Sequence, residues 1–272
     1  MAARVPGVVN GNYAAAGGSK MVDVIVLAGT AKSSELTIAE QVQNKAFVQI
    51  HGQAMLNYVL TALQQTSSVQ RIAVVGPLAE LQTLIGDSAQ VIAVDEGSSI
   101  VENLQRGLQA LQPNKHCLVA ASDAAFLTPA AVNHFLAACR PYEAAVYYPI
   151  VRREDNDRCF PGVKRTYVKL ADGEFTGGNL FLINPAALEK VMPRLEEFFA
   201  LRKSPLRLAA ALGFGFVLKL LTKRLTIAEL EKRFFALFSA VGKAVISPYA
   251  ELGTDVDKPS DLELARRRLK PL

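Results

Sequence analysis

The chain has 272 residues and a mass of 29.4 kDa, with 50% hydrophobic and 20% charged residues. Its length suits one large domain or two modest ones, and its composition excludes intrinsic disorder, collagen and coiled coil. The 30 Lys and Arg residues exceed the 25 Asp and Glu residues, which gives a formal charge of +5. This surplus is too small for a nucleic-acid-binding protein, so we expect no nucleic-acid partner.

The three cysteines, Cys117, Cys139 and Cys159, are odd in number and widely separated. They cannot build a disulfide framework, and no C-x-x-C pair suggests zinc binding or redox chemistry. We therefore expect a soluble protein in a reducing compartment, the cytoplasm.

Residues 1–20 are rich in Ala, Gly, Val and Asn and show no periodicity. They lack the charged region and clean apolar core of a secretory signal. Because Met21 directly precedes an apolar strand, we expect residues 1–20 to be a disordered arm or an expression remnant. Residues 21–272 are then expected to form a single domain.

From residue 22 onward, short apolar runs alternate with segments of helical periodicity. The expected strands lie at 22–28, 71–76, 91–94 and 116–123, and the expected helices at 55–65, 78–85, 100–111 and 128–139. Strands that are apolar throughout and separated by amphipathic helices are typical of a parallel sheet buried on both faces. This pattern predicts an α/β protein with three α/β/α layers.

The simple alternation ends near residue 142. Further strands are expected at 144–150, 163–170 and 177–184, around a charged stretch at 152–158. Here the sheet is expected to become mixed. Helical sequence fills 185–238, followed by a strand at 243–248, the loop GTDVDKPSDL and a terminal helix.

The first strand leads into a loop of small residues, Leu27-Ala28-Gly29-Thr30-Ala31-Lys32-Ser33-Ser34. Open α/β sheets bind ligands at the carboxyl ends of their parallel strands, and small residues let backbone N–H groups approach phosphate oxygens. The glycine spacing matches neither a P-loop nor an ordinary dinucleotide-binding motif. Lys45 follows, in QNKAFVQIHGQAMLNYVLTAL.

This region resembles a nucleotidyltransferase pattern in which L-A-G-G-x-G-x-R precedes a lysine, a short strand, G-x-P-M-L and a helix. By this resemblance the chain is identified as a member of the MobA-like NTP transferases, which have a GT-A-type fold. The resemblance implies that Lys45 neutralises nucleotide phosphates and that Leu27, Ala28, Gly29 and Thr30 bind the nucleotide. Thr30 replaces the second glycine and the G-x-R is absent, which leaves Lys32 as the substitute cation. A plain turn with a solvated lysine is the alternative.

Two acidic segments complete the resemblance. Asp123, in Ala121-Ser122-Asp123-Ala124-Ala125-Phe126-Leu127-Thr128-Pro129, matches the family's D-x-P-F-L-T-P. At the tip of a central strand it is the expected Mg²⁺ ligand, although an Asx turn is an alternative role. Asp255 and Asp257 alternate in DVDKPSDL, so they face one side of an extended chain. By alignment with the family's closing motif, Asp257 is the expected second metal ligand, and Asp261 with Ser260 is expected to cap the last helix.

The acceptor side of the site is expected at Gly177, Gly178 and Asn179, which resemble the family's G-G-N segment. Arg165 is the nearby cation best suited to holding an acceptor phosphate. A β-bulge with a buried amide is the alternative role for the glycine pair. On the nucleotide side, Ser98 and Asn103 lie where family members recognise base and ribose, although Ser98 could instead cap a helix.

The positive charge is concentrated in residues 201–234, which hold eight basic and two acidic side chains. The apolar run at 208–218 is too short to cross a bilayer, so we expect no transmembrane segment. Compared with compact members of the family, the region resembles a helical insertion, which is expected at about 194–240. A lid over the acceptor site, a homodimer contact, a peripheral membrane contact and a plain solvated face remain alternatives.

Together these observations predict a Mg²⁺-dependent nucleotidyltransferase. It transfers a nucleoside monophosphate from an NTP to a phosphorylated small-molecule acceptor and releases pyrophosphate, with Lys45, Asp123 and Asp257 as the catalytic residues. A glycosyltransferase that uses a sugar nucleotide, and a non-catalytic nucleotide-binding protein, are the alternatives. The nucleotide, the acceptor and the oligomeric state stay open at this stage.

Overall fold

The computed structural model describes residues 21–30, 33–188, 191–192, 194 and 211–272. The expected arm at 1–20, Lys32 and the 201–210 part of the basic stretch lie outside these residues.

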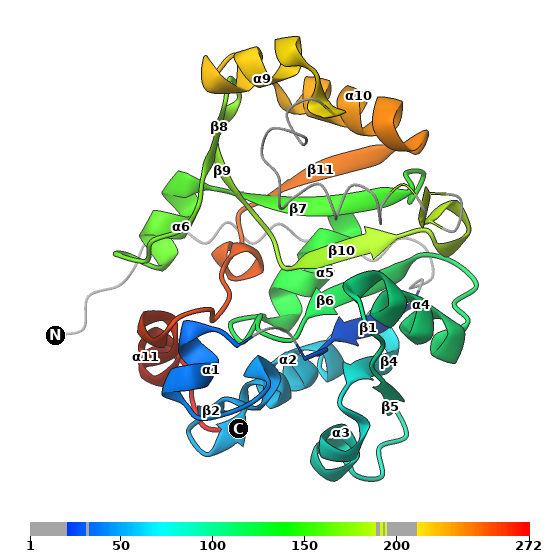
Figure 1. Ribbon diagram of the computed structural model, residues 1–272, viewed down its shortest axis with the longest axis vertical. Helices are drawn as coiled ribbons and strands as arrows, with labels where there is room; N and C mark the ends of the chain where they lie inside the picture. The colour runs from blue at the N-terminus through cyan, green and yellow to red at the C-terminus, as the bar shows by residue number, and fades with distance from the viewer. Residues whose placement is uncertain (1–20, 31–32, 189–190, 193, 195–210) are drawn as a thin grey trace, which may run out of the picture.

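In the described part of the chain, nine strands form one mixed sheet through the middle of the molecule (Figure 1). The strand order is β5-β4-β1-β6-β10-β7-β9-β8, and β11 pairs with β7. The strands β5, β4, β1 and β6 are parallel, as are β7 and β11, whereas β10 runs antiparallel to β6 and β7. The bounds are β1 (Val22–Leu27), β4 (Val69–Gly76), β5 (Val91–Asp95), β6 (Cys117–Ala121), β7 (Val146–Arg152), β8 (Val168–Leu170), β9 (Gly173–Gly177), β10 (Leu180–Ile183) and β11 (Gly242–Ser247).

Helices cover both faces of this sheet, which gives the three-layer α/β/α fold that the sequence predicts. The α-helices are α1 (Glu35–Ala39), α2 (Met55–Gln64), α3 (Leu78–Ile85), α4 (Ile100–Leu111), α5 (Pro129–Ala138), α6 (Arg153–Cys159), α9 (Phe214–Leu221), α10 (Ile227–Phe238) and α11 (Pro259–Arg268). Short 3₁₀ turns are η1 (Lys45–Phe47) and η2 (Ala250–Gly253), and β2 (Gln49–Ile50) pairs with β3 (Gln53–Ala54).

The alternation of side chains along β1 divides the core in two. Val24 and Val26 pack with residues of α2, α5 and α11, whereas Ile25 packs on the other face with residues of α4. Successive side chains of a strand point to opposite faces, so a strand covered on both faces must be apolar throughout. This explains the uninterrupted apolar run that predicts β1.

The strand that pairs with β7 changes at a glycine pair, Gly177 and Gly178. One edge of β7 pairs first with β10 and then with β9, and residues 178–179 connect these two strands. The Gly178 amide donates to the Pro149 carbonyl at 2.9 Å. A Cβ on Gly178 would lie 2.6 Å from Pro149 Cγ, so this close approach to β7 requires glycine.

The structure differs from the sequence-based expectation at three short segments. The strand expected at 163–170 is limited to Val168–Leu170, because Arg165 instead turns to the segment before α11. The charged stretch forms α6, which the pairs Arg153–Asp157 and Arg158–Asp155 support at one-turn spacing. Helix α1 was not expected, and a capping box between Ser34 and Thr37 starts it.

Helices α9 and α10 lie within the expected helical insertion. They contact the end of the sheet that holds β8, β9 and β11, through residues such as Phe216 and Leu230. None of the helices in the described ranges combines the length and the apolar character needed to cross a bilayer. The lid, homodimer and membrane roles of the 201–234 stretch stay predictions.

Helix α4 depends on a close contact that allows no side chain. A Cβ on Gly107 would lie 2.6 Å from Ile25 Cγ2 in the core. Gly107→Ala should therefore lower the free energy of unfolding by about 1–3 kcal/mol through overpacking, against the roughly 1 kcal/mol gain that Ala usually brings to a helix. Urea denaturation measures this change.

The control is Gln109→Ala on the exposed side of the same helix. It should change stability by no more than about 0.5 kcal/mol. A stabilised Gly107→Ala protein would show that α4 does not rest on β1 as described.

Candidate active site

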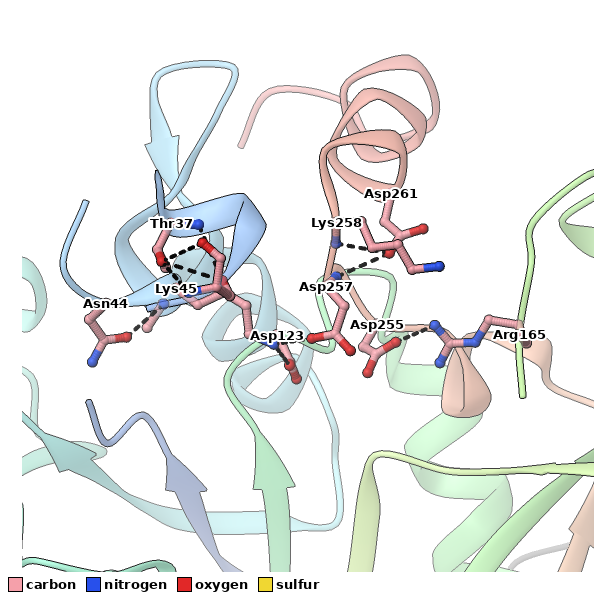
Figure 2. A network of polar contacts seen from close by, with 11 residues as sticks. Thr37, Asn44, Lys45, Asp123, Arg165, Asp255, Asp257, Lys258 and Asp261 are labelled. Carbon is pink, nitrogen blue, oxygen red and sulfur yellow. Dashed lines mark hydrogen bonds and ion pairs between the residues drawn. The ribbon is translucent and has the colours of Figure 1, made fainter. Parts of the chain in front are cut away.

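Three carboxylates meet at the tip of the sheet (Figure 2). Asp123 follows β6, and Asp255 and Asp257 lie between η2 and α11. One carboxylate oxygen from each lies within 4.8 Å of the others. The Val256 amide donates to the Asp123 backbone carbonyl at 3.0 Å, which fastens the two segments together.

The spacing of Asp255 and Asp257 explains why both belong to this cluster. The intervening Val256 is fully buried in the core. In an extended segment the residues on either side of it face the opposite direction, toward the cluster. The structure thus brings together the expected ligands Asp123 and Asp257 and adds Asp255 beside them.

Lys45 lies between two of these carboxylates. Its Nζ is 2.5 Å from Asp123 Oδ2 and also contacts Asp257 Oδ1. Burial alone lowers the pKa of Lys45, but attraction and hydrogen bonds from Asp123 and Asp257 raise it above its usual value. Lys45 therefore stays charged and holds the two carboxylates near each other.

Asn44 places Lys45 against the first loop. Its Oδ1 accepts a hydrogen bond from the Ala46 amide at 2.9 Å and starts η1. Its Nδ2 donates to the Ala28 carbonyl at 2.8 Å. The buried Asn44 thus links the lysine turn to the loop that follows β1.

Asp255 has a separate cationic partner. Arg165 pairs with Asp255 through Nη1, and its Nη2 donates to the Gly253 carbonyl at 2.5 Å. Burial and the neighbouring Asp123 raise the pKa of Asp255, and Arg165 partly offsets this rise. Arg165, expected at the acceptor side, is held against the acidic cluster by these contacts. A role in acceptor binding stays a prediction.

The cluster has the chemistry of a divalent-cation site. Asp123 Oδ1 is buried and has no hydrogen-bond partner among the described residues. A buried carboxylate oxygen without a partner is costly unless a ligand completes it. Carboxylate oxygens are also the ligands that Mg²⁺ prefers. Asp123, Asp255 and Asp257 therefore fit such an ion.

The loop after β1 closes against the segment that follows β5. Glu96 accepts hydrogen bonds from the Thr30 amide and, at 2.8 Å, from the Thr30 hydroxyl. A Cβ on Gly29 would lie 2.3 Å from Asn103 Nδ2, so only glycine fits above that side chain. Asn103 is itself fixed, because its Oδ1 accepts from the Gly97 amide at 2.6 Å.

The remaining expected nucleotide residues have different surroundings. Leu27 is half-buried at the end of β1, and Ala28, the next residue of the loop, is buried. Ser98 does not cap α4, because Ser99 does. The Ser98 amide and hydroxyl donate to Glu102 at 2.7 and 2.8 Å, and these bonds lower the pKa of Glu102 to about 2. Nucleotide contacts at these positions stay predictions.

The glycine pair packs against aromatic and proline side chains of β7. A Cβ on Gly177 would lie 2.0 Å from Tyr148 Oη. The Asn179 amide donates to the Leu252 carbonyl at 2.8 Å, and the Asn179 carbonyl accepts from the Ala121 amide at 3.0 Å. Asn179 therefore connects β6 to the segment that carries Asp255 and Asp257. Acceptor binding by Gly177, Gly178 and Asn179 stays a prediction.

Sequence reasoning missed Asn44, which shapes the site and could have been found from the preference for Asn before a helical turn. The hydrogen bonds between Glu96 and Thr30 carry no comparable signal, because they depend on two loops meeting in space.

Comparisons with known proteins agree with this architecture. The model of the MobA-like NTP transferase domain matches residues 24–212, which is more than half of the chain. The chain belongs to the MobA-like NTP transferase family. Curated protein sequences contain no significant match to it.

Three solved structures resemble this chain over most of its length. A hypothetical transferase from Thermus thermophilus is 36% identical, with a TM-score of 0.79 over 89% of this chain and 99% of that one. The 4-diphosphocytidyl-2C-methyl-D-erythritol synthase of Anaerococcus prevotii is 12% identical, with a TM-score of 0.56 over 92% and 96%. A CMP:2-keto-3-deoxy-manno-octonic acid synthetase complexed with CTP is 13% identical, with a TM-score of 0.55 over 91% and 97%. The last two share the fold of this chain.

The Arg165–Asp255 pair gives a test of how the site is held. Arg165→Ala should lower the free energy of unfolding by about 1–3 kcal/mol, because it leaves a largely buried carboxylate without its charged partner. Urea denaturation of Arg165→Ala, Asp255→Ala and the double variant forms a complete cycle. The double variant should cost less than the sum of the single changes by about 0.5–3 kcal/mol. Strict additivity would mean that the pair does not hold the closing segment.

Proposed function

We propose that this MobA-like protein is a nucleotidyltransferase that transfers a nucleoside monophosphate from an NTP to a phosphorylated small-molecule acceptor. The observation that carries the proposal is the position of Lys45, between Asp123 and Asp257 and beside the loop after β1. A cation and several carboxylates next to a glycine-containing loop suit a triphosphate and its counter-ion. Membership of the family supports the same reaction class.

The reaction needs positioning and charge neutralisation more than proton transfer. An oxygen of the acceptor phosphate attacks the α-phosphorus, the bond from that phosphorus to the bridging oxygen breaks, and pyrophosphate leaves with the electron pair. Because the acceptor oxygen is already anionic, no protein base is required. Fixed positive charge offsets the repulsion between the two anions.

Each residue of the cluster has a role in this proposal. Lys45 neutralises the triphosphate, and Asn44 fixes its position relative to the Ala28 carbonyl. Asp123, Asp255 and Asp257 would hold Mg²⁺, which when bound supplies charge neutralisation and orients the phosphates. Arg165 acts as a positioning residue, because it holds Asp255 and the Gly253 carbonyl.

CTP is the first donor to test. The names of two proteins with the same fold concern cytidine nucleotides. Thermal unfolding with each of the four NTPs, with and without Mg²⁺, measures donor binding. A donor at about 100 times its dissociation constant stabilises the native state by about 2.7 kcal/mol, which raises Tm by several degrees.

We expect a selective shift with one NTP that requires Mg²⁺ and is lost in Asp123→Asn. The matched control is Asp87→Asn, an exposed carboxylate outside the cluster. It should keep the full shift. A shift that persists in Asp123→Asn would remove the assigned role of that residue.

The released product tests the reaction itself. A nucleotidyltransferase forms one pyrophosphate for each nucleotide transferred, which a coupled pyrophosphatase assay detects. Stabilisation by a sugar nucleotide with release of a nucleoside diphosphate would instead support the glycosyltransferase alternative. Tight NTP binding without pyrophosphate, for every class of phosphorylated acceptor, would support a binding protein.

A further inference from the structure

A cavity of about 450 Å³ lies on the α4 side of the sheet, with Leu27 at the end of β1 in its wall. Its walls come from the α4 side of the sheet, from β10 and from the helices α9 and α10, with Leu104, Phe181, Phe216, Leu230, Phe234 and Leu237 among them. The α10 residues recur at the three- and four-residue spacing of one helix face. The volume is within the usual range for small-molecule sites.

The described part of the cavity wall is almost wholly apolar. Arg233 is its single charged member, and the Arg233 guanidinium donates to the Ala211 carbonyl. Arg233 Nε is buried without a partner among the described residues, so one hydrogen-bond donor of this part of the wall is unused. A polar ligand such as a sugar would lose its hydrogen bonds to water here and gain few in return. The wall therefore suits a hydrocarbon group.

Two aromatic residues lie between the cavity wall and the strand end that carries the glycine pair. Phe181 lines the cavity and stacks on Tyr148, with ring centroids 4.7 Å apart and an interplanar angle of 14°. Tyr148 Oη reaches Gly177, and burial together with the charge of Asp255 raises the pKa of Tyr148. At the other side, Leu27 lines the cavity and directly precedes the loop that packs on Asn44 and Glu96.

We propose that this cavity receives the hydrocarbon part of the acceptor, and that the acceptor is a phosphorylated amphiphile. Its phosphate lies near the glycine pair, where a cation held by the acidic cluster would offset its charge, its body crosses the Tyr148–Phe181 pair, and its apolar chain or ring lies against α4 and α10. This assignment rests on the proposed nucleotidyltransferase function. It names the substrate class of that same site.

A series of n-alkyl phosphates, from butyl to decyl and each below its critical micelle concentration, tests the assignment. Isothermal titration calorimetry on the full chain with saturating CTP and Mg²⁺ gives each dissociation constant. We expect affinity to rise about fourfold per added methylene until the cavity is filled. Equal affinity along the series would overturn the assignment.

A pair of matched variants separates the cavity from nonspecific adsorption. Leu230→Trp narrows the cavity, whereas Leu218→Trp places the same side chain on the exposed face of the neighbouring helix α9. The increase in affinity with chain length should stop at a shorter chain in Leu230→Trp, and it should be unchanged in Leu218→Trp. If both variants keep the full gain, the chains bind elsewhere and the assignment fails. Leu237→Trp repeats the test if Leu230→Trp does not fold.

Nucleotide binding and binding of the acceptor chain are measured separately. In both tryptophan variants the thermal stabilisation by CTP and Mg²⁺ should equal that of the original protein, because neither residue lies in the nucleotide loop. If no NTP binds the original protein, the nucleotidyltransferase function is wrong, whatever the alkyl phosphates do. If CTP binds but chain length has no effect, only the acceptor class is wrong.

Discussion

The contact of the Lys45 ammonium with Asp123 and Asp257 is the interaction on which the rest of the site depends. Three carboxylates whose oxygens lie within 4.8 Å of one another repel strongly, since the protein screens charge less than water does. Lys45 and Arg165 offset that repulsion from opposite sides of the cluster. The fold therefore has to bring two cationic and three anionic side chains from separate parts of the chain close together.

Backbone contacts achieve this convergence. The tip of β6 is tied to the closing segment by the Val256 amide and, through Asn179, to the Leu252 carbonyl. Asn44 ties the lysine turn to Ala28 at the end of β1. Because these links are made by buried or main-chain groups, they place the charged side chains with little loss of freedom on ligand binding. The glycine pair at 177–178 then leaves room for Tyr148, which stacks on Phe181 in the wall of the apolar cavity.

The sequence predicts the parts of this design that are encoded locally. The apolar run of β1, the strand before Asp123 and the alternation of Asp255 and Asp257 all follow from periodicity, and the short motifs identify the family. What could not be predicted depends on distant segments meeting, as in the pairing of Arg165 with Asp255 and of Glu96 with Thr30. The cavity is of the same kind, because helices and strands from separate parts of the chain build its walls. Lys32 lies outside the described residues, and its expected role stays a prediction.

The central claim is that the acidic cluster, two of whose carboxylates pair with Lys45, binds a divalent cation. Titration of the nucleotide-free protein with Mn²⁺, followed by electron paramagnetic resonance, tests it most directly. The account predicts that Lys45→Met binds Mn²⁺ about tenfold more tightly than the original protein, because a competing charge is gone, and that Asp123→Asn binds at least about tenfold more weakly. Equal affinity in all three proteins, or weaker binding in Lys45→Met, would contradict it.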